Sequence, residues 1–297
     1  MVSPYFRRYD SRVFLRGPCS RGAAMIIDKS SVERHYTRGD LLERILAALA
    51  ATGKDIDALV AADLSPVDEF HTRGRDATDE LAALAGITAG LHVLDVGSGI
   101  GGPARHLASE RGCRVTGIDL TAEFVRTATA LSRRVGLSDR VSFVAGDALD
   151  LPFPAASFDL VWTQHAAMNI ADRPRLYAEM HRVLRPGGRL ALQDVLAGSA
   201  GPPHFPVPWA RRPEESFLVD ETTQRRLLAG AGFTVRNCRD VTGTAVDWFA
   251  ARRARLQSMP LGMGLLLGDD FPAMIANQER NLVEGRVVVL QAVAVRD

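Results

Sequence analysis

The residues best suited to bind a ligand stand in "LHVLDVGSGIGGPARHLA", residues 91–108, where a hydrophobic run ends at Asp95 and four glycines follow within six positions. Glycines such as Gly97 and Gly99 allow backbone to approach a ligand without a clash from Cβ. A helix that begins after them would point its first amides at the same place, which suits an anionic group. The pattern therefore indicates either a nucleotide-type cofactor site or a tight turn from strand to helix.

Two carboxylates narrow the chemistry of this site. Asp119 ends the next apolar stretch, "RVTGID", where an acidic side chain can accept both hydroxyls of a ribose. Asp95 would repel a pyrophosphate beside the turn and attract a cation. The glycine spacing also departs from the GxGxxG pattern of dinucleotide sites, and position 103 is proline. The charge pattern thus favours S-adenosylmethionine, a cationic cofactor, over the NAD of a dehydrogenase.

An α/β fold must position these residues, because predicted strands alternate with helices at steps of about 25 residues. That rhythm predicts a parallel sheet with helices on both faces. The expected strands are 92–96, 114–119, 141–147, 159–164, 188–195, 234–241 and 286–296, and the expected helices are 41–53, 76–87, 103–111, 122–137, 173–185, 220–233, 244–257 and 272–285. We expect loops at 148–158 and 258–271.

Four segments in chain order, "VLDVGSGIGG", "GIDL", "GDALDLPFPAASFDLVW" and "RVLRPGGRL", resemble the motifs of class I S-adenosylmethionine-dependent methyltransferases. The resemblance spans residues 65–240 and is strongest to the small-molecule group that includes sarcosine/dimethylglycine, phosphoethanolamine, tocopherol and ubiquinone-pathway enzymes. It implies a Rossmann-like, seven-stranded, mostly parallel sheet of order 3-2-1-4-5-7-6. The last strand would be antiparallel, with helices on both faces and substrate-cap insertions.

The resemblance also implies eleven cofactor contacts, each at a position that matches a family motif. They are Asp95, Gly97, Ser98 and Gly99 for the methionine end; Asp119, Leu120, Asp147 and Ala148 for the ribose and adenine; Gln164 for the methyl-transfer site; and His71 and Arg73 for the segment over the cofactor.

His165 is the candidate catalytic residue, because "WTQHAAMNI" would leave the sheet beside the methyl group. Methyl transfer is an in-line displacement, and holding the nucleophile in line can supply much of the acceleration. A general base is needed only if the nucleophile carries a proton at working pH. His165 is therefore interpreted either as that base or as a hydrogen-bonded part of the pocket wall.

The acceptor would contact two segments, "PPHFPVPWA" and "MPLGMGLLLG", on the substrate side of the fold. Their candidate residues are His204, Phe205, Trp209 and Met263. If they form a pocket, the acceptor is a mostly apolar small molecule; otherwise they are core or homodimer contacts. Three alternatives stay open: an N-methyltransferase of the glycine/sarcosine type, an NAD-dependent oxidoreductase, and a protein that binds the cofactor without turnover.

Composition limits the partners and the cellular location that the sequence allows. The 297 residues are 46% hydrophobic, and the net charge of +1 gives no electrostatic reason to expect nucleic acid or an anionic membrane as partner. Three scattered cysteines fit a cytoplasmic protein without a metal site. We expect a disordered extension at 1–24 and one methyltransferase domain at 25–297: a helical lid (25–88), a cofactor-binding core (89–195), and a substrate cap with sheet completion (196–297).

Overall fold

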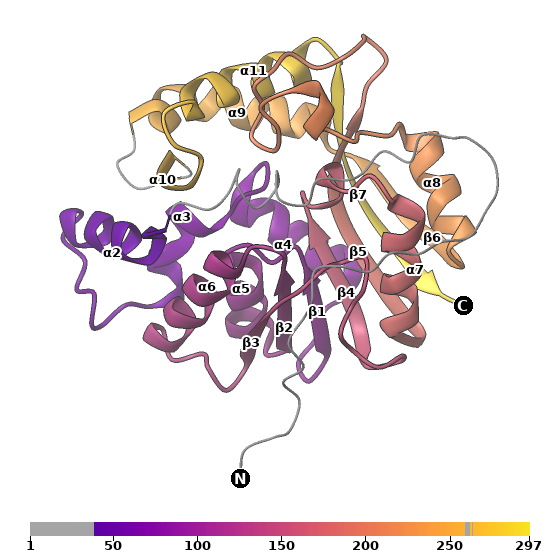
Figure 1. The fold of residues 1–297 in the computed structure, drawn as a ribbon, viewed down its shortest axis with the longest axis horizontal. Helices are drawn as coiled ribbons and strands as arrows, with labels where there is room; N and C mark the ends of the chain where they lie inside the picture. The colour runs from indigo at the N-terminus through magenta and orange to yellow at the C-terminus, as the bar shows by residue number, and fades with distance from the viewer. Residues whose placement is uncertain (1–38, 259–261, 263) are drawn as a thin grey trace, which may run out of the picture.

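A seven-stranded sheet of order β3-β2-β1-β4-β5-β7-β6 forms the centre of the computed structural model, which describes residues 39–258, 262 and 264–297 (Figure 1). β7 is antiparallel to both of its neighbours, β5 and β6, and the other pairs are parallel. The expected order and the antiparallel last strand are therefore confirmed. The strands are β1 (His92–Val96), β2 (Arg114–Asp119), β3 (Val141–Ala145), β4 (Phe158–Gln164), β5 (Leu184–Ala197), β6 (Phe233–Asp240) and β7 (Val287–Arg296).

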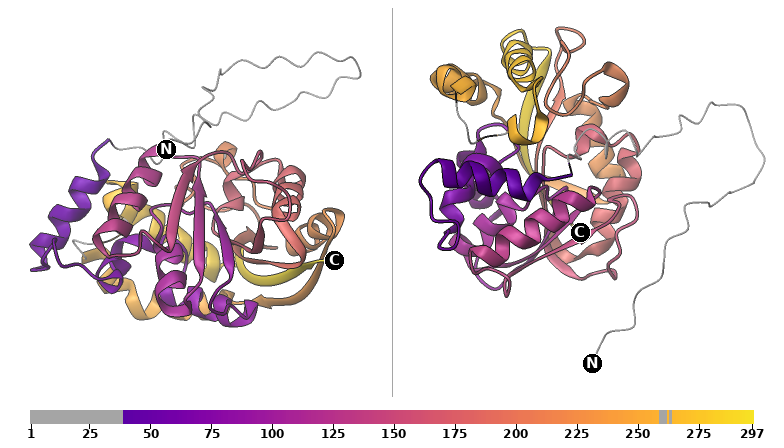
Figure 2. Two further views of the ribbon diagram at one scale, coloured as in Figure 1. Left: turned by 90° about the horizontal axis from the view of Figure 1, so that it is seen from below. Right: turned by 60° about the vertical axis from the view of Figure 1, so that its left-hand side comes forward.

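Helices cover both faces of this sheet, as Figure 2 shows from two further sides. α4, α5 and α6 contact one group of strands, whereas α7 and α8 pack together against β5 and β6. These helices are α4 (Gly74–Ala85), α5 (Gly102–Arg111), α6 (Ala122–Arg134), α7 (Arg173–Val183) and α8 (Glu221–Gly230).

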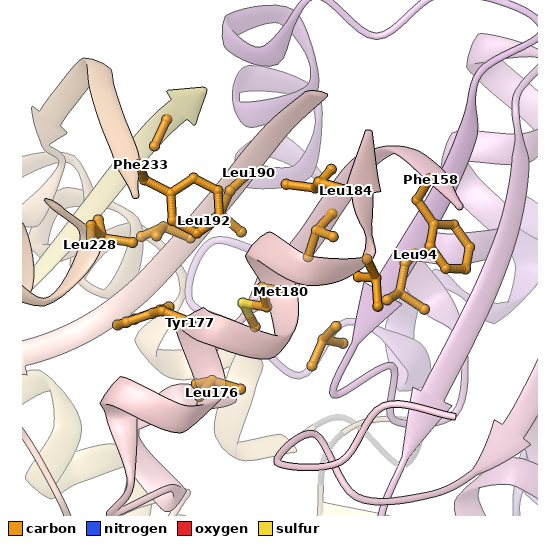
Figure 3. Packing of buried hydrophobic residues seen from close by; sticks show 14 of the residues in the cluster. Leu94, Phe158, Leu176, Tyr177, Met180, Leu184, Leu190, Leu192, Leu228 and Phe233 are labelled. Carbon is orange, nitrogen blue, oxygen red and sulfur yellow. The ribbon is translucent and has the colours of Figure 1, made fainter. Parts of the chain in front are cut away.

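Side-chain alternation along β1 explains why the sheet needs both layers. Val93 packs with residues of α4 and α5, whereas the next residue, Leu94, packs on the opposite face with residues of α7. Figure 3 shows this second cluster, in which Leu94, Phe158 and Leu184 belong to the strand side. The apolar side of α7, with Leu176, Tyr177 and Met180, completes the cluster. Because both faces are buried, the strands read as nearly continuous apolar runs.

The β3–β4 connection lacks a helix, as the sequence predicted. Its residues Leu151 and Phe153 pack into the α7-side cluster, where a helix would otherwise cover the strands. Strand order reverses between β1 and β4, because β2 and β3 lie on one side of β1 and β4 lies on the other. In open α/β sheets, this switch point is where a crevice opens at the carboxyl ends of the strands.

A cap lies over the carboxyl ends of the strands (Figure 1). Its helices α9 (Thr242–Ser258) and α11 (Phe271–Val283) pack on each other and on β7, and α10 (Gly264–Leu267) contacts α2 (Leu41–Ala51). The short elements, which are η1 (Ala61–Leu64), α3 (Ser65–Asp68), η2 (Ala167–Asn169), η3 (Pro213–Glu215) and α10, were not predicted. Helices of three or four residues carry too little periodicity to be seen in a sequence.

Two expectations cannot be compared with the structure, because the proposed extension at 1–24 and the proposed pocket residue Met263 lie outside the described residues. Among the described residues, no helix is both long enough and apolar enough to cross a membrane.

Candidate functional site

A cavity of about 640 Å³ opens between the carboxyl ends of the strands and the cap. It is lined by the glycine turn after β1, by the ends of β2 and β4, by residues 65–76, and by α9, α10 and α11. Most of the site residues predicted from the sequence meet here. Those on its wall are His71, Arg73, Gly97, Gly99, Asp119, Leu120, Asp147, Ala148, Gln164, His165 and Trp209.

The glycine turn brings the ends of β1 and β4 into contact. Gly97 has a φ of +78°, and a Cβ built on it would lie 2.5 Å from the Cβ of Ala166 in the loop after β4. Gly99 has a φ of +53° and faces the ring of Phe70. Any other residue at these two positions would be strained and would push the walls of the cavity apart.

Asp119 is fixed in place by backbone amides. The Gly99 amide donates to its Oδ2 at 2.8 Å, and the Thr121 amide donates to its Oδ1 at 2.9 Å. Burial raises the pKa of Asp119, and these amides act in the opposite direction. Each carboxylate oxygen can accept a second hydrogen bond, so the side chain can still accept hydroxyl groups from the cavity that it lines.

Asp95 and Ser98 are buried, with exposures of 2% and 4%, and are not among the residues that line the cavity. The Oδ2 atom of Asp95 and the Oγ atom of Ser98 are nevertheless buried without a hydrogen-bond partner. Burial, and then the charge of Asp119, raises the pKa of Asp95 to about 8. An uncompensated carboxyl beneath the turn is stabilised by a nearby cation.

We expect the unfolding free energy of the free protein to fall as pH rises from about 4 to about 8, and Asp95→Asn to reduce this slope. In that range Asp95 holds a proton in the native protein that it has lost in the unfolded chain. Asp95 therefore makes the unfolding free energy decrease with pH, by at most ~1.4 kcal/mol per pH unit. Urea unfolding of both proteins at pH 5, 6, 7 and 8 measures it. Parallel curves would show that Asp95 ionises normally in the folded protein.

A buried ion pair anchors the segment over the turn. Arg105 of α5 donates to Asp68 at 2.9 Å, and both side chains are at most 2% exposed. A Cβ on Gly102 would overlap the carbonyl oxygen of Asp68. Phe70 then packs on Phe124 of α6, with 5.8 Å between ring centroids. Residues 65–76 therefore form a fixed wall of the cavity rather than a loose lid.

Gln164 has a defined amide orientation. Its Oε1 accepts from the indole Nε1 of Trp162 at 3.0 Å and from the Thr78 hydroxyl at 3.2 Å. Its Nε2 atom is buried without a hydrogen-bond partner. The side chain thus offers two N–H donors that no group in the described structure uses.

His165 also lines the cavity, and it has a backbone φ of +51°, which is uncommon outside glycine. Its amide donates to the Gln193 carbonyl at 2.8 Å, and the Gln193 side-chain Nε2 lies 3.4 Å from its ring Nε2. Gln193 Nε2 is a donor because its Oε1 accepts from Gln291. Burial lowers the pKa of His165 to about 3. The imidazole is therefore neutral, with one nitrogen engaged by the protein.

Sequence reasoning missed a polar cluster that links these residues. The Thr78 hydroxyl lies 3.0 Å from His71 Nε2 and 3.3 Å from Glu69 Oε2, in addition to its contact with Gln164. Burial lowers the pKa of His71 to about 4. Glu69 stands two residues before His71 in the segment that the resemblance placed over the cofactor, which was its only sequence signal.

The cap side of the cavity is largely apolar. Arg252 is the cation on this side among the described lining residues: it lies 3.6 Å from Asp76 of α4 and 5.0 Å from the centroid of the Trp248 ring. The apolar and aromatic side chains here are Met168, Ile170, Trp209, Trp248, Phe249, Leu265, Leu267, Phe271 and Ile275.

Two predicted acceptor residues do not reach the cavity. His204 is held by α11 and by the residue that follows this helix. The His204 amide donates to Asn281 of α11, and the His204 Nε2 lies 2.8 Å from Glu284. Phe205 packs against the cap cluster of Val207 and Trp209. The Pro-rich insert contributes Pro208 and Trp209 to the wall instead.

Comparison with known proteins agrees with the fold and the motifs. Residues 94–192 match a family described as a methyltransferase domain. The chain is 44% identical over 114 residues to a sterol 24-C-methyltransferase of Eremothecium gossypii, covering 38% of this chain and 31% of the relative. It is 34% identical over 181 residues to the erythromycin 3''-O-methyltransferase of Saccharopolyspora erythraea, covering 56% and 59%. The aligned part thus spans less than two thirds of these relatives.

A solved structure resembles nearly the whole chain. The cyclase SpnF has a TM-score of 0.64 and 25% sequence identity, and the match covers 90% of this chain and 96% of that chain. The match of residues 94–192 to the methyltransferase-domain family and the similarity to the two methyltransferase relatives confirm the resemblance to class I S-adenosylmethionine-dependent methyltransferases. The relatives also differ in the reaction that their names state, so the fold does not define the reaction.

Proposed function

We propose that the protein transfers a methyl group from S-adenosylmethionine to a small, mostly apolar acceptor. The observation that carries this proposal is that the glycine turn after β1, the Asp119 carboxylate and the Gln164 amide meet on the wall of one cavity, where Gln164 Nε2 is buried without a hydrogen-bond partner. Buried polar groups are rarely left unpaired, so this amide indicates a missing ligand. A carboxylate that can accept hydroxyl groups and two amide N–H donors fit the ribose and the carboxylate of the cofactor, and the buried Asp95 carboxyl beneath the turn favours a cation nearby.

Residues of the cavity would hold the rest of the cofactor. Asp119 would accept the ribose hydroxyls, and Leu120, Asp147 and Ala148 would border the adenine. The sulfonium would supply an electrophilic methyl group when the cofactor is bound. The protein's contribution is then to orient the acceptor in line with it and to keep water out.

The apolar wall of the cap supports the proposed acceptor class. Trp209, Trp248 and Phe249 face the cavity, and the cation on that side, Arg252, is already engaged by Asp76 and Trp248. A glycine-sized zwitterion would leave this apolar surface unfilled, and its charges would lack partners there. The glycine/sarcosine alternative is therefore disfavoured.

We expect Trp248→Ala to raise the KM for an apolar acceptor about tenfold or more and to leave the affinity for S-adenosylhomocysteine unchanged. The partly buried indole forms part of the cap side of the cavity, so its removal would take away apolar surface that the acceptor buries, at about 25 cal/mol per Å². Calorimetry with S-adenosylhomocysteine and steady-state kinetics separate the two effects. A loss of affinity for both ligands would place the cofactor, not the acceptor, against the cap.

Calorimetry also tests the proposal against its rivals. S-adenosylhomocysteine should bind and NADH should not; binding of NADH alone would support an oxidoreductase. Incubation with methyl-labelled S-adenosylmethionine and a metabolite extract should then yield labelled products. Cofactor binding without any labelled product across extracts and acceptor panels would instead favour a protein that holds the cofactor without methyl transfer.

A further inference from the structure

Glu69 carries an unused carboxylate oxygen on the wall of the cavity. The residue lies between α3 and α4 and is 8% exposed. Its Oε2 lies 3.3 Å from the Thr78 hydroxyl oxygen and 3.3 Å from His71 Nε2. Its Oε1 is buried and has no hydrogen-bond partner. A carboxylate oxygen held in this way is rare unless a ligand completes its contacts.

Arg75 provides a matching donor. Its Nε is also buried without a hydrogen-bond partner and lies 3.7 Å from Glu69 Oε1, beyond the range of a direct hydrogen bond. A single hydroxyl oxygen can sit within hydrogen-bond distance of both atoms, donating its proton to Glu69 and accepting from Arg75. An apolar carbon could satisfy neither of them.

We propose that Glu69 and Arg75 bind the hydroxyl group of the acceptor and that Glu69 accepts its proton, which makes the reaction an O-methylation. This inference rests on the proposed function. The acceptor oxygen forms a bond to the methyl carbon while the bond from that carbon to the sulfonium sulfur breaks. The sulfur leaves as the neutral thioether of S-adenosylhomocysteine, and the hydroxyl proton moves to the Glu69 carboxylate.

The surroundings of Glu69 set the expected pH dependence. Burial, and then the charge of Asp68, raises the pKa of Glu69 to about 8, against the opposite effects of Arg75, Thr78 and Arg105. His71 is neutral near pH 7, because burial lowers its pKa to about 4. The fraction of Glu69 able to accept a proton therefore grows with pH, and the rate should rise up to about pH 8.

His165 is less suited to take this proton. Its Nε2 faces the Gln193 amide donor, and burial lowers its pKa to about 3. A limb near pH 8 could not arise from a group that is already deprotonated above about pH 4. The pH profile therefore separates the two candidates.

The test compares the wild type with Glu69→Gln, which keeps the side-chain shape and the contact with Thr78. The probes are geraniol, geranylamine and 2-naphthol, each incubated with methyl-labelled S-adenosylmethionine; geraniol offers both a hydroxyl and an alkene carbon. Mass spectrometry identifies the methylated atom. Glu110→Gln, at an exposed position on α5, is the matched control. Melting temperature and the Kd for S-adenosylhomocysteine are measured for every variant.

We expect O-methylated products, a kcat lowered by about 10²–10⁴-fold in Glu69→Gln, and loss of the limb near pH 8. The Kd for S-adenosylhomocysteine and the control should not change. O-methylation that survives in Glu69→Gln, products only on nitrogen or carbon, or a weakened cofactor affinity would each overturn the inference and leave the proposed function standing. If cofactor binds and no probe or extract component is methylated, the proposed function fails, and the inference fails with it.

Discussion

Asp119→Ala should weaken S-adenosylhomocysteine binding by about 3 kcal/mol or more, roughly a hundredfold in Kd. A hydrogen bond to a charged group contributes about 1.5–3 kcal/mol, and a ribose offers two hydroxyls. The same carboxylate also accepts from the amides of Gly99 and Thr121. Removing it would therefore release the glycine turn as well as the ribose, which is why the loss should exceed that of an isolated contact.

Calorimetry on three variants separates these two roles. Asp119→Asn keeps one acceptor oxygen and should show an intermediate loss, whereas Asp139→Ala changes an exposed carboxylate and should bind like the wild type. The melting temperature without ligand reports on the turn alone. If Asp119→Ala kept its affinity, the ribose would have to lie elsewhere, and the assignment of the cofactor across β1 and β2 would be wrong.

The parts of the fold that could be predicted are those in which local pattern and packing agree. β1 is an apolar run that ends in Asp95 and a glycine turn, and the structure begins and ends it at the expected residues, His92 and Val96. α4 begins at Gly74, two residues before the prediction, because the reversal of the chain at Arg73 depends on a φ of +74°. Sequence patterns do not reveal such a backbone conformation in a residue other than glycine.

The residues on the sheet side of the cavity were more predictable than those on the cap side. Gly97, Gly99 and Asp119 each follow a strand, and the carboxyl ends of parallel strands meet at one edge of the sheet. His204 was a candidate because its insert is rich in prolines and rings. Its orientation, however, is set by Asn281 and Glu284, which lie about 80 positions away and could not be paired with it from one sequence.

Buried polar networks were the least predictable features. Gln193 and Gln291 stand in strands that read as apolar, and they orient His165 only because β5 and β7 align them side by side. Glu69 stands in the segment that the resemblance placed over the cofactor, but no pattern in the sequence singled it out. Its side chain is only 8% exposed because α3 and the residues around Thr78 cover it. These contacts leave no periodic pattern in the sequence from which they could be predicted.

Arg105→Met should lower the unfolding free energy by about 3–5 kcal/mol. The guanidinium lies in the core, where it donates to Asp68 of α3 at 2.9 Å and to Ser132 of α6 at 3.2 Å. Its loss would leave the Asp68 carboxylate buried without its counter-charge, and an unpaired buried charge costs several kcal/mol. Urea unfolding monitored by circular dichroism measures the change.

The double variant Arg105→Met, Asp68→Leu distinguishes the charge from the packing. Replacing a whole buried ion pair by apolar side chains of similar volume is often neutral, so the double variant should regain most of the lost stability. Cofactor affinity should depend on whether residues 65–76 keep their position on the cavity wall rather than on the overall stability of the protein. The reason is that Asp68 is continuous with Glu69 and His71 in the segment that lines the cavity. A single variant within 1 kcal/mol of the wild type would contradict the role of this ion pair. It would mean that Phe70, packed on Phe124, holds the segment against the glycine turn without help from the charge.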